Sequence, residues 1–366
     1  MFIHTGDYVE YGSNDVLKST YYTFTPRPLL NGDFYKMDDD LAALLASAHR
    51  TIGMLEGMMF SISDKELFRQ LMMFRECCYS KAIDSPDFDI KSVITEQGLD
   101  DTDVLNIVSA YKYALETDIS KLNYDDIFRR IVNEDASKKK AYTRSKQIFL
   151  SNTTVNYRKY NPTAPENISP ALHDIRKYID SSETDAVIKA ALCHYQFEMI
   201  HPYEYGNGLV GRILAYKILS NAGIRGVCYM NLSEYLYSHK GEYFDKLGAA
   251  QRHGNYREWI DFFIHAIDES AWRTIELMKT CEEAIQSDMQ KTDSCGAKSP
   301  HRAVYRYFKE NVTSSVKYAS RQLNLSYNVV SRSVEILKEL NILIQITAGS
   351  RNRIFAHREL LRIILY

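Results

Sequence analysis

The stretch from Phe197 to Leu214 constrains the fold more than any other part of the chain. It reads FEMIHPYEYGNGLVGRIL, in which a histidine is followed within a dozen residues by three glycines, an asparagine and an arginine. Apolar residues lie on both sides of this polar centre. The pattern predicts the end of one helix, a glycine-rich turn and the start of a second helix. The exposed backbone N–H groups at such a helix start can bind an anion such as phosphate.

Three side chains in this stretch suit phosphate chemistry. Arg212 is expected on the first turns of the second helix, where a guanidinium can donate two hydrogen bonds to phosphate oxygens. Asn207 can donate a hydrogen bond from inside the loop. His201, just upstream, is placed to accept a proton from an attacking hydroxyl. Any one of these residues is more often structural, but their joint spacing favours a site.

Residues 206–211 also match GxGxxG, the fingerprint of dinucleotide-binding folds. That fingerprint requires a buried strand directly before it. Here the preceding residues, 184–199, place their apolar side chains at mostly helical spacing and contain no run of β-branched residues. The sequence therefore argues against a Rossmann-type site.

Residues 201–212, HPYEYGNGLVGR, resemble the HPFx(D/E)GNGRxxR motif of the Fic family. The resemblance extends over about residues 38–285 and implies a mainly α fold, with a Fic-type helical core that carries a β-hairpin flap. Two positions depart from the motif. Tyr205 stands where the family has its magnesium-binding carboxylate, and Leu209 stands where it has its first arginine.

The resemblance implies a protein adenylyltransferase, which moves AMP from ATP to a Ser, Thr or Tyr hydroxyl of a target protein (AMPylation). His201 is then the catalytic base, Arg212 binds the distal phosphates, and the α-phosphate is held by Gly206, Asn207 and Gly208. Mg²⁺ is expected from the family. The two departures remove electrostatic stabilisation of the transferring group, so weakened activity is expected. Transfer of another group, such as UMP or phosphocholine, is an open alternative.

A segment ahead of the core is similar to the inhibitory helix of many Fic proteins, (S/T)xxxE(G/N). Ser80 matches this pattern, whereas Asp84 and Ser85 depart from it. In the family the glutamate pairs with the last arginine of the motif, which is Arg212 here. Because Asp84 is one methylene shorter, a looser or water-mediated contact is expected. A solvent-exposed carboxylate at a helix end is the alternative.

Two further features of the Fic family have counterparts in the sequence. Residues 147–160 have the pattern of a hairpin, where the family has its flap, although a plain surface hairpin has the same pattern. One helix after the motif carries aromatic and amide side chains where the family lines its base pocket. These are Tyr243, Phe244 and Gln251, and the aromatic pair also suits a hydrophobic core.

Apolar spacing predicts the remaining helices of the core. Residues 38–58 form the first, and Ser63 with Glu66 predicts a capping box for a second helix that stops before Pro86. Further helices are expected over 105–115, 124–132, 171–179, 186–200, 213–220, 256–266 and 271–285.

The C-terminal 66 residues resemble a winged helix-turn-helix in pattern, with three helical runs and a hairpin. They carry 11 Lys and Arg against 4 Glu, a net charge of +7. Positive charge suits binding to a phosphate backbone, but winged helices also serve as dimerisation or protein-docking modules. The candidate DNA contacts are Asn328, Ser331 and Arg332 on the third helix, with Arg351 and Arg353 on the wing.

Composition supports a helical, multi-domain protein. The chain has 366 residues, 27 of them Tyr and only 16 Gly and 8 Pro. The first residues lack the pattern of a signal peptide, and no stretch approaches 18 apolar residues, so a cytoplasmic protein without membrane contact is expected. The six cysteines form no CxxC pair and are expected to be reduced.

The predicted domains are an N-terminal arm and helices with the candidate inhibitory helix (1–90), a Fic core (91–286), a linker (287–300) and the winged helix (301–366). The main alternative function is that of a catalytically degenerate Fic protein that acts as a DNA-binding regulator through its winged helix. Homodimerisation stays open.

Overall fold

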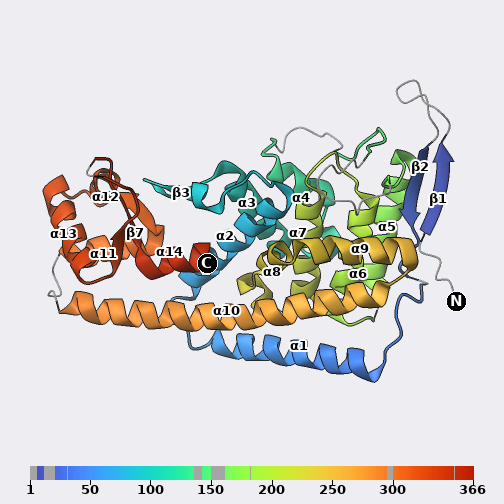
Figure 1. The fold of residues 1–366 in the computed structure, drawn as a ribbon, viewed down its shortest axis with the longest axis horizontal. Helices are drawn as coiled ribbons and strands as arrows, with labels where there is room; N and C mark the ends of the chain where they lie inside the picture. The colour runs from blue at the N-terminus through green and yellow to red at the C-terminus, as the bar shows by residue number, and fades with distance from the viewer. Residues whose placement is uncertain are drawn as a thin grey trace.

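The computed structural model describes residues 6–11, 21–30, 32–135, 142–149, 161–181, 183–294, 300–349 and 351–366. The described chain is mainly helical (Figure 1). None of its helices combines the length and the apolar character needed to cross a membrane. The described cysteines Cys77, Cys78, Cys193, Cys228 and Cys281 are all free thiols.

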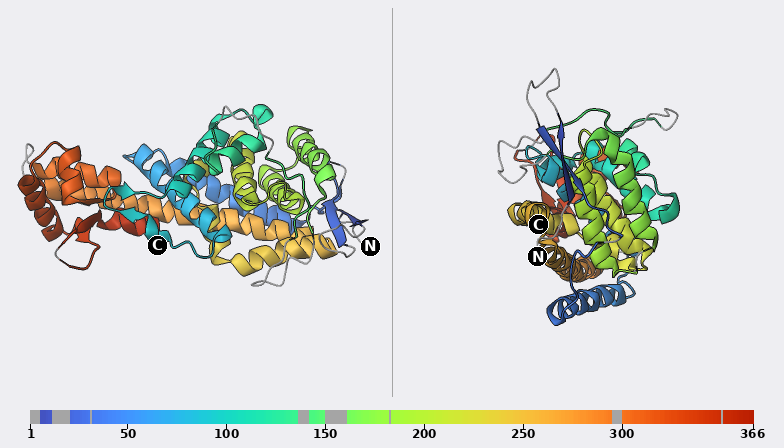
Figure 2. Two further views of the ribbon diagram at one scale, coloured as in Figure 1. Left: turned by 90° about the horizontal axis from the view of Figure 1, so that it is seen from above. Right: turned by 90° about the vertical axis from the view of Figure 1, so that its right-hand side faces the viewer.

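Helix α10 (Tyr256–Asp293) is 38 residues long and runs along the length of the molecule (Figure 1). Helix α1 (Asp39–Met58) packs along it, on the side that faces away from the other helices (Figure 2). The sequence predicted two helices in place of α10, and this was wrong. No glycine or proline interrupts residues 256–293, and α10 packs against α1, α6 and α9, so the helix continues.

Helix α2 (Lys65–Asp84) crosses the middle of the molecule and ends before Pro86, as predicted. The predicted capping box was wrong. Asp64 is the N-cap and accepts a hydrogen bond from Leu67 N at 3.1 Å. Ser63 instead donates hydrogen bonds from its N–H and its hydroxyl to Glu282 of α10, both at 2.9 Å. Tertiary contact with α10 has therefore replaced the local cap.

The central pair of helices is almost fully buried. Helix α6 (Ala186–Ile200), which has the predicted bounds, and helix α7 (Asn207–Asn221) pack against each other and are enclosed by their neighbours. Those neighbours are α3 (Thr102–Glu116), α4 (Tyr124–Ile131), α5 (Pro165–Ser181), α8 (Leu232–Ser238) and α9 (Lys240–His253).

Helix α5 begins earlier than predicted, because Pro165 suits the first turn of a helix, where its missing N–H is not needed. The helix expected to carry Tyr243, Phe244 and Gln251 is α9, and the short helix α8 precedes it and meets it at His239.

Small strands lie at the edges of the helical core. β1 (Gly6–Tyr11) and β2 (Tyr21–Pro26) form an antiparallel hairpin in the segment predicted as an extended arm. The short strands β3 (Ile94–Thr95) and β4 (Gly98–Leu99) follow the 3₁₀ helix η1 (Ile90–Val93). Residues 150–160, which hold most of the predicted flap, lie outside the described residues.

The C-terminal unit, residues 300–357, has a hydrophobic core of its own. Its sheet has the order β5-β7-β6 and is antiparallel throughout. The three helices and the hairpin are present where the sequence predicted them, and the structure adds strand β5. The elements are α11 (Pro300–Asn311), β5 (Thr313–Ser315), α12 (Val316–Gln322), α13 (Tyr327–Glu339), β6 (Leu343–Gln345) and β7 (Ile354–His357).

Helix α14 (Arg358–Leu365), which the sequence did not predict, joins the C-terminal unit to the rest of the molecule. It leaves β7 directly and packs on α2 and α10, so that Ile363 and Ile364 belong to the main core. Helix α10 extends to Asp293 and so occupies the first half of the predicted linker. Helix α14 therefore docks the C-terminal unit on the main core.

Candidate functional site

His201 ends helix α6 in a left-handed conformation. Its φ is 52°, and its N–H still donates to Phe197 O at 3.0 Å, so the residue closes the helix while turning the chain. A non-glycine residue with positive φ is uncommon and persists only where its surroundings hold it. The side chain is 7% exposed. The turn therefore presents the imidazole at a fixed place beside the start of α7.

Arg144 holds this turn, although no sequence motif predicted a role for it. Its guanidinium donates to His201 O at 2.9 Å and to Ile200 O at 3.3 Å, and its own N–H donates to Pro202 O at 2.9 Å. It also donates to Thr163 O. Burial lowers the pKa of Arg144 to about 10. The residue lies outside any motif, so only the fold reveals that it collects the carbonyls at the end of α6.

The loop between α6 and α7 is closed by its own side chains. Asn207 Oδ1 accepts a hydrogen bond from Tyr203 N at 2.8 Å, and Asn207 Nδ2 donates to Tyr203 O at 2.9 Å. The Tyr203 ring stacks on Phe128 at 4.3 Å, and its hydroxyl donates to Asp125 Oδ1 at 3.0 Å. Gly206 has a φ of 72°. The Asn207 amide, predicted to face a phosphate, is thus engaged with the loop backbone.

Arg212 is 1% exposed and is held by helix α2. Its Nε donates to Ser80 Oγ at 2.8 Å, and its Nη2 donates to Ser80 O at 2.9 Å and to Asp84 Oδ2 at 2.8 Å. The water-mediated contact considered for Asp84 was therefore wrong: the contact is direct. Burial alone would lower the pKa of Arg212, but the nearby charges, Asp84 above all, raise it above its ordinary value.

One edge of the Arg212 guanidinium lies over Gly208. A Cβ at position 208 would lie 2.8 Å from Arg212 Nη1 and 2.8 Å from Asp84 Oδ1. This Nη1 is buried and has no hydrogen-bond partner among the described residues. Asp84 differs in being partly open, with 29% of its side chain exposed. The loop thus offers a buried cation with one unused donor beside a carboxylate at the rim.

The two positions that depart from the motif line a cavity beside the C-terminal end of α2, with Ser85 among the residues that line it. The Tyr205 side chain is 61% exposed and Leu209 is 8% exposed. Both line a cavity of about 410 Å³ that also touches Lys81, Asp103 and Asn133.

The residues of this loop do not fit the magnesium ion that the resemblance implies. A phenol occupies the position of the carboxylate, and Glu204 is exposed. Among the described residues no group of three or more His, Cys, Asp or Glu side chains could hold a metal. Carboxylate oxygens are the protein ligands that Mg²⁺ prefers, so the site supplies little for it.

The residues predicted to line a base pocket are mostly enclosed. The Tyr243 hydroxyl is hydrogen-bonded to His194 Nε2 at 2.7 Å in the core. Gln251 is 2% exposed and donates to the Tyr8 hydroxyl of β1. Phe244 is half-buried. Burial, together with the charge of Arg212, lowers the pKa of His194 to about 3, so that this ring is neutral.

The predicted DNA contacts lie at the far end of the molecule, in the C-terminal unit (Figure 1). Asn328, Arg332 and Arg351 are exposed, and Ser331 is half-buried. Arg353 Nη1 instead pairs with Glu335 Oε1 of α13 at 2.7 Å. The structure therefore brings Arg212, Ser80 and Asp84 together at the start of the helix that follows the His201 turn, and leaves the DNA candidates apart from them.

Comparison with known proteins adds to this geometry. Residues 115–219 match the Fic/DOC family. The chain is 26% identical over 213 residues to the protein adenylyltransferase Fic of Nematostella vectensis, which covers 56% of this chain and 47% of that protein. It is 35% identical over 79 residues to a probable protein adenylyltransferase of Aquifex aeolicus, covering 21% of this chain and 25% of that one. The chain spans less than half the length of these relatives.

In three dimensions the chain is similar to the crystal structure of a Fic family protein from Desulfovibrio desulfuricans G20. The TM-score is 0.59 and the identity 16%, over 88% of this chain and 97% of the other. At this identity the similarity shows the fold alone. The predicted fold class, a mainly helical Fic-like core with small sheets, is confirmed.

Proposed function

We propose, since residues 115–219 match the Fic/DOC family, that this protein transfers AMP from ATP to a hydroxyl of a target protein. The observation that carries the proposal is the position of Arg212. It is buried on the second turn of α7, with a free Nη1 beside Gly208, on the helix whose first amides face the loop after His201. A cation with an unused donor at a helix start is suited to hold nucleotide phosphates.

The transfer proceeds at the α-phosphorus of ATP. The hydroxyl oxygen of a target Ser, Thr or Tyr attacks the phosphorus and forms the new P–O bond. The bond from the α-phosphorus to the bridging oxygen breaks, and pyrophosphate leaves with the electron pair. His201 takes the hydroxyl proton. The amides at the start of α7 and the Arg212 guanidinium stabilise the negative charge that develops.

Each residue of the loop has a distinct task in this scheme. Gly206 and Gly208 let the backbone approach the α-phosphate. Gly206 has a positive φ that residues with a side chain rarely adopt, and a Cβ at position 208 would collide with Arg212 and Asp84. Asn207 acts through the turn that its amide closes. Arg144 is a positioning residue, because it holds the carbonyls of Ile200 and His201.

Asp84 restrains the reaction. Its carboxylate accepts a hydrogen bond from Arg212 Nη2, which the distal phosphates of ATP also require. Two anions compete for one guanidinium, so Asp84 weakens productive nucleotide binding. Because the Asp84 side chain is partly exposed, it can turn towards water, while the buried Arg212 keeps its hydrogen bonds to Ser80. Ser80 orients the guanidinium from the same helix turn.

Labelled transfer tests this proposal. Purified full chain, alone and with cell lysate, is incubated with α-labelled ATP and either Mg²⁺ or Mn²⁺. We expect protein-bound label that His201→Ala abolishes and Asp84→Ala increases severalfold. Asp87→Ala is the matched control, since Asp87 is an exposed carboxylate beyond the end of α2 and should change nothing. Label that persists in His201→Ala would contradict the mechanism, and equal rises in both aspartate variants would contradict the restraint.

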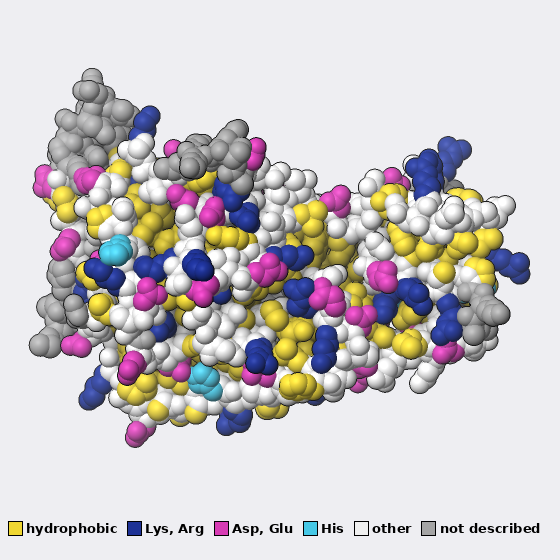
Figure 3. Space-filling model, turned by 180° about the vertical axis from the view of Figure 1, so that it is seen from behind, with side chains coloured by type: hydrophobic (Ala, Val, Ile, Leu, Met, Phe, Trp, Pro, Cys, Tyr) yellow, Lys and Arg dark blue, Asp and Glu magenta, His cyan; other side chains and the backbone are white. Residues whose placement is uncertain are grey.

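A second candidate function is regulation through DNA. It is favoured by Arg332 and Arg351, which are exposed, and by the net charge of +7 in the C-terminal 66 residues. Figure 3 shows Lys and Arg side chains standing out at this end of the molecule. Tyr205 and Leu209 favour it as well, because they weaken the transfer site.

A gel shift with duplex DNA at several salt concentrations tests the second candidate. We expect binding that weakens steeply with salt and that Arg332→Ala reduces at all sequences. Arg353→Ala should matter less, because Arg353 pairs with Glu335. An absence of binding at low salt would exclude this function. Absence of both label transfer and ATP binding would leave it as the sole candidate.

A further inference from the structure

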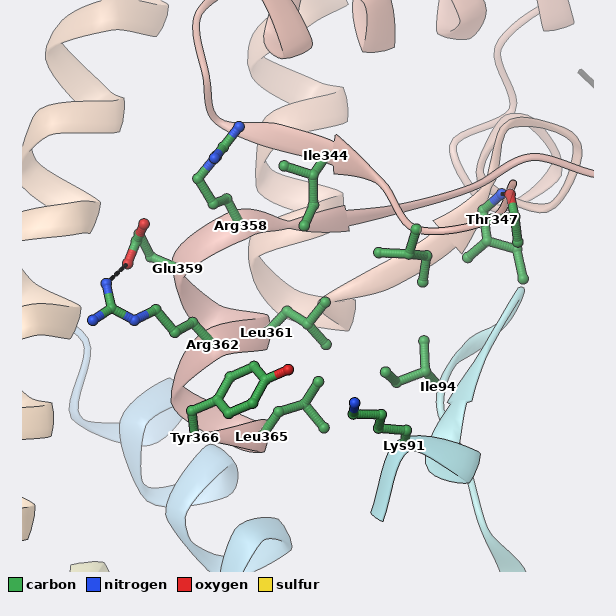
Figure 4. Close-up of a pocket in the computed structure, with 12 residues that line it drawn as sticks. Lys91, Ile94, Ile344, Thr347, Arg358, Glu359, Leu361, Arg362, Leu365 and Tyr366 are labelled. Carbon is green, nitrogen blue, oxygen red and sulfur yellow. Dashed lines mark hydrogen bonds and ion pairs between the residues drawn. The ribbon is translucent and has the colours of Figure 1, made fainter. Parts of the chain in front are cut away.

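A cavity of about 810 Å³ lies where the C-terminal unit meets the rest of the chain (Figure 4). Three separate segments form its walls: the η1–β3 segment, strand β6 with the loop after it, and helix α14. It lies apart from His201 and Arg212, neither of which lines it. Its volume falls in the range of roughly 300 to 1,000 Å³ that is usual for small-molecule sites.

The floor of this cavity is aliphatic. Figure 4 shows side chains from the three segments facing one common space. Several of them are only half-buried, so they keep apolar surface in contact with water, which a ligand could cover favourably. The aliphatic lining residues are Ile94, Ile344, Ile346, Ile354, Leu361 and Leu365.

The rim of the cavity is positively charged. Three of its lining residues are cations, Lys91, Arg358 and Arg362, against one carboxylate, Glu359. Glu359 pairs with Arg362 at 3.5 Å, away from the open centre (Figure 4). The Lys91 ammonium points into the cavity beside Leu365, and among the described residues no carboxylate pairs with it. The charge therefore calls for an anion next to an apolar body.

We propose that this cavity binds a small anionic amphiphile, a linear aliphatic carboxylate. The alkyl chain lies on the isoleucine and leucine floor, and the carboxylate accepts hydrogen bonds from the Lys91 ammonium at the rim. An apolar ligand offers no hydrogen-bond acceptor to the ammonium, and a fully polar anion would leave the aliphatic side chains in contact with water. Only a molecule with both parts complements both surfaces. The proposal stands independently of AMP transfer.

Calorimetric titration of the full chain with octanoate, decanoate and dodecanoate, all below micelle formation, tests this site. We expect one saturable site whose Kd falls by about fourfold for each added methylene until the floor is covered. Lys91→Gln should weaken decanoate about tenfold and leave decanol unchanged. Lys279→Gln is the matched control, since Lys279 is an exposed lysine on α10 away from the cavity.

A second variant tests the cavity itself. Ile346→Trp fills the space from the loop after β6, where the residue is half-buried, and should abolish decanoate binding while the unfolding transition stays cooperative. The proposal is overturned if decanoate gives no saturable binding, if decanol or decylamine binds as tightly as decanoate, or if Ile346→Trp leaves binding intact.

Discussion

Helix α2 makes two arginine contacts, and they differ in how completely water is excluded. In its middle, Arg75 is 0% exposed and donates to both carboxylate oxygens of Glu234, at 2.6 and 3.1 Å. The same guanidinium donates to Ile363 O at 2.6 Å and Ile364 O at 2.8 Å, at the end of α14. At its C-terminal end, α2 supplies Asp84 to Arg212, and this carboxylate is partly exposed.

The Arg75 contact is a permanent attachment, whereas the Asp84 contact can open. Each side-chain nitrogen of Arg75 donates to an acceptor inside the protein, so removing it deprives two carbonyls of their donor and leaves Glu234 only the longer contact with Arg273 at 3.8 Å. Asp84 can turn to solvent, and Arg212 keeps its hydrogen bonds to Ser80 when it does. One helix can thus hold the C-terminal unit permanently and still release the proposed nucleotide site.

The largest expected effect is the loss of the buried contact. Arg75→Ala should lower the free energy of unfolding by about 3 to 5 kcal/mol, because it leaves buried polar groups without partners. Arg69→Ala on the same helix is the control: its pair with Glu66 lies at the surface and should contribute under about 1 kcal/mol. Urea unfolding followed by circular dichroism measures both. Equal losses of unfolding free energy in the two variants would mean that burial does not determine how much each contact contributes.

The next effect concerns His194, the neutral ring beside Arg212. Its pKa falls from 6.5 to about 3 on burial, so the unfolded chain binds a proton between these values and the folded chain does not. Stability is therefore full above pH 6.5 and is lost as the pH falls. Between pH 7 and pH 5 the loss should be about 2 kcal/mol. His194→Gln should remove this part of the pH dependence, and an unchanged slope would contradict it.

A smaller effect is expected from Gly208→Ala. The added methyl group meets Arg212 Nη1 and Asp84 Oδ1, both at 2.8 Å, so one of the two must move, at a cost of about 1 kcal/mol. If Asp84 is the group that moves, the cost should shrink in the Asp84→Ala background. A double-mutant cycle by urea unfolding measures this coupling. Strict additivity would show that Asp84 does not move when the methyl group is added.

The smallest effect on stability is expected from Asp84→Asn. Asp84→Asn keeps an amide oxygen that can accept the hydrogen bond from the buried Arg212 Nη2, and the side chain at position 84 is partly exposed, so the substitution should cost under about 1 kcal/mol, in contrast to Arg75→Ala. Label transfer from ATP should nevertheless rise in this variant. A destabilisation comparable to that of Arg75→Ala would place both contacts in the same class.

Local patterns in the sequence were enough to predict part of this architecture. The bounds of α6 followed from apolar spacing and from the turn at His201. The resemblance of residues 80–85 to an inhibitory helix also predicted that Asp84 would approach Arg212, although it left the contact loose or water-mediated and kept an exposed carboxylate at a helix end as the alternative. The contact is direct, because α2 and α7 pack together and bring Asp84 Oδ2 to 2.8 Å from Arg212 Nη2.

The features that sequence reasoning missed depend on distant partners. Arg144 contacts carbonyls some 56 to 58 residues away, and backbone carbonyls leave no mark on a sequence. Ser63 was predicted to cap α2, but its N–H and hydroxyl donate hydrogen bonds to Glu282 of α10 instead. The sequence prediction divided α10 into residues 256–266 and 271–285, and the structure joins them. There the helix is stabilised by packing on both sides, which periodicity alone does not reveal.

The unbroken course of α10 carries a consequence for how this protein can change in length. A helix of 38 residues is about 57 Å long and turns by about 100° with each residue. Adding or deleting one residue in its middle would rotate everything beyond it by that angle and pull α14 away from Arg75. Seven residues make nearly two turns and restore the rotation, but they also lengthen the helix by about 10 Å. Because α14 must reach Arg75 at hydrogen-bond distance, α10 should tolerate substitutions far better than insertions or deletions in its middle.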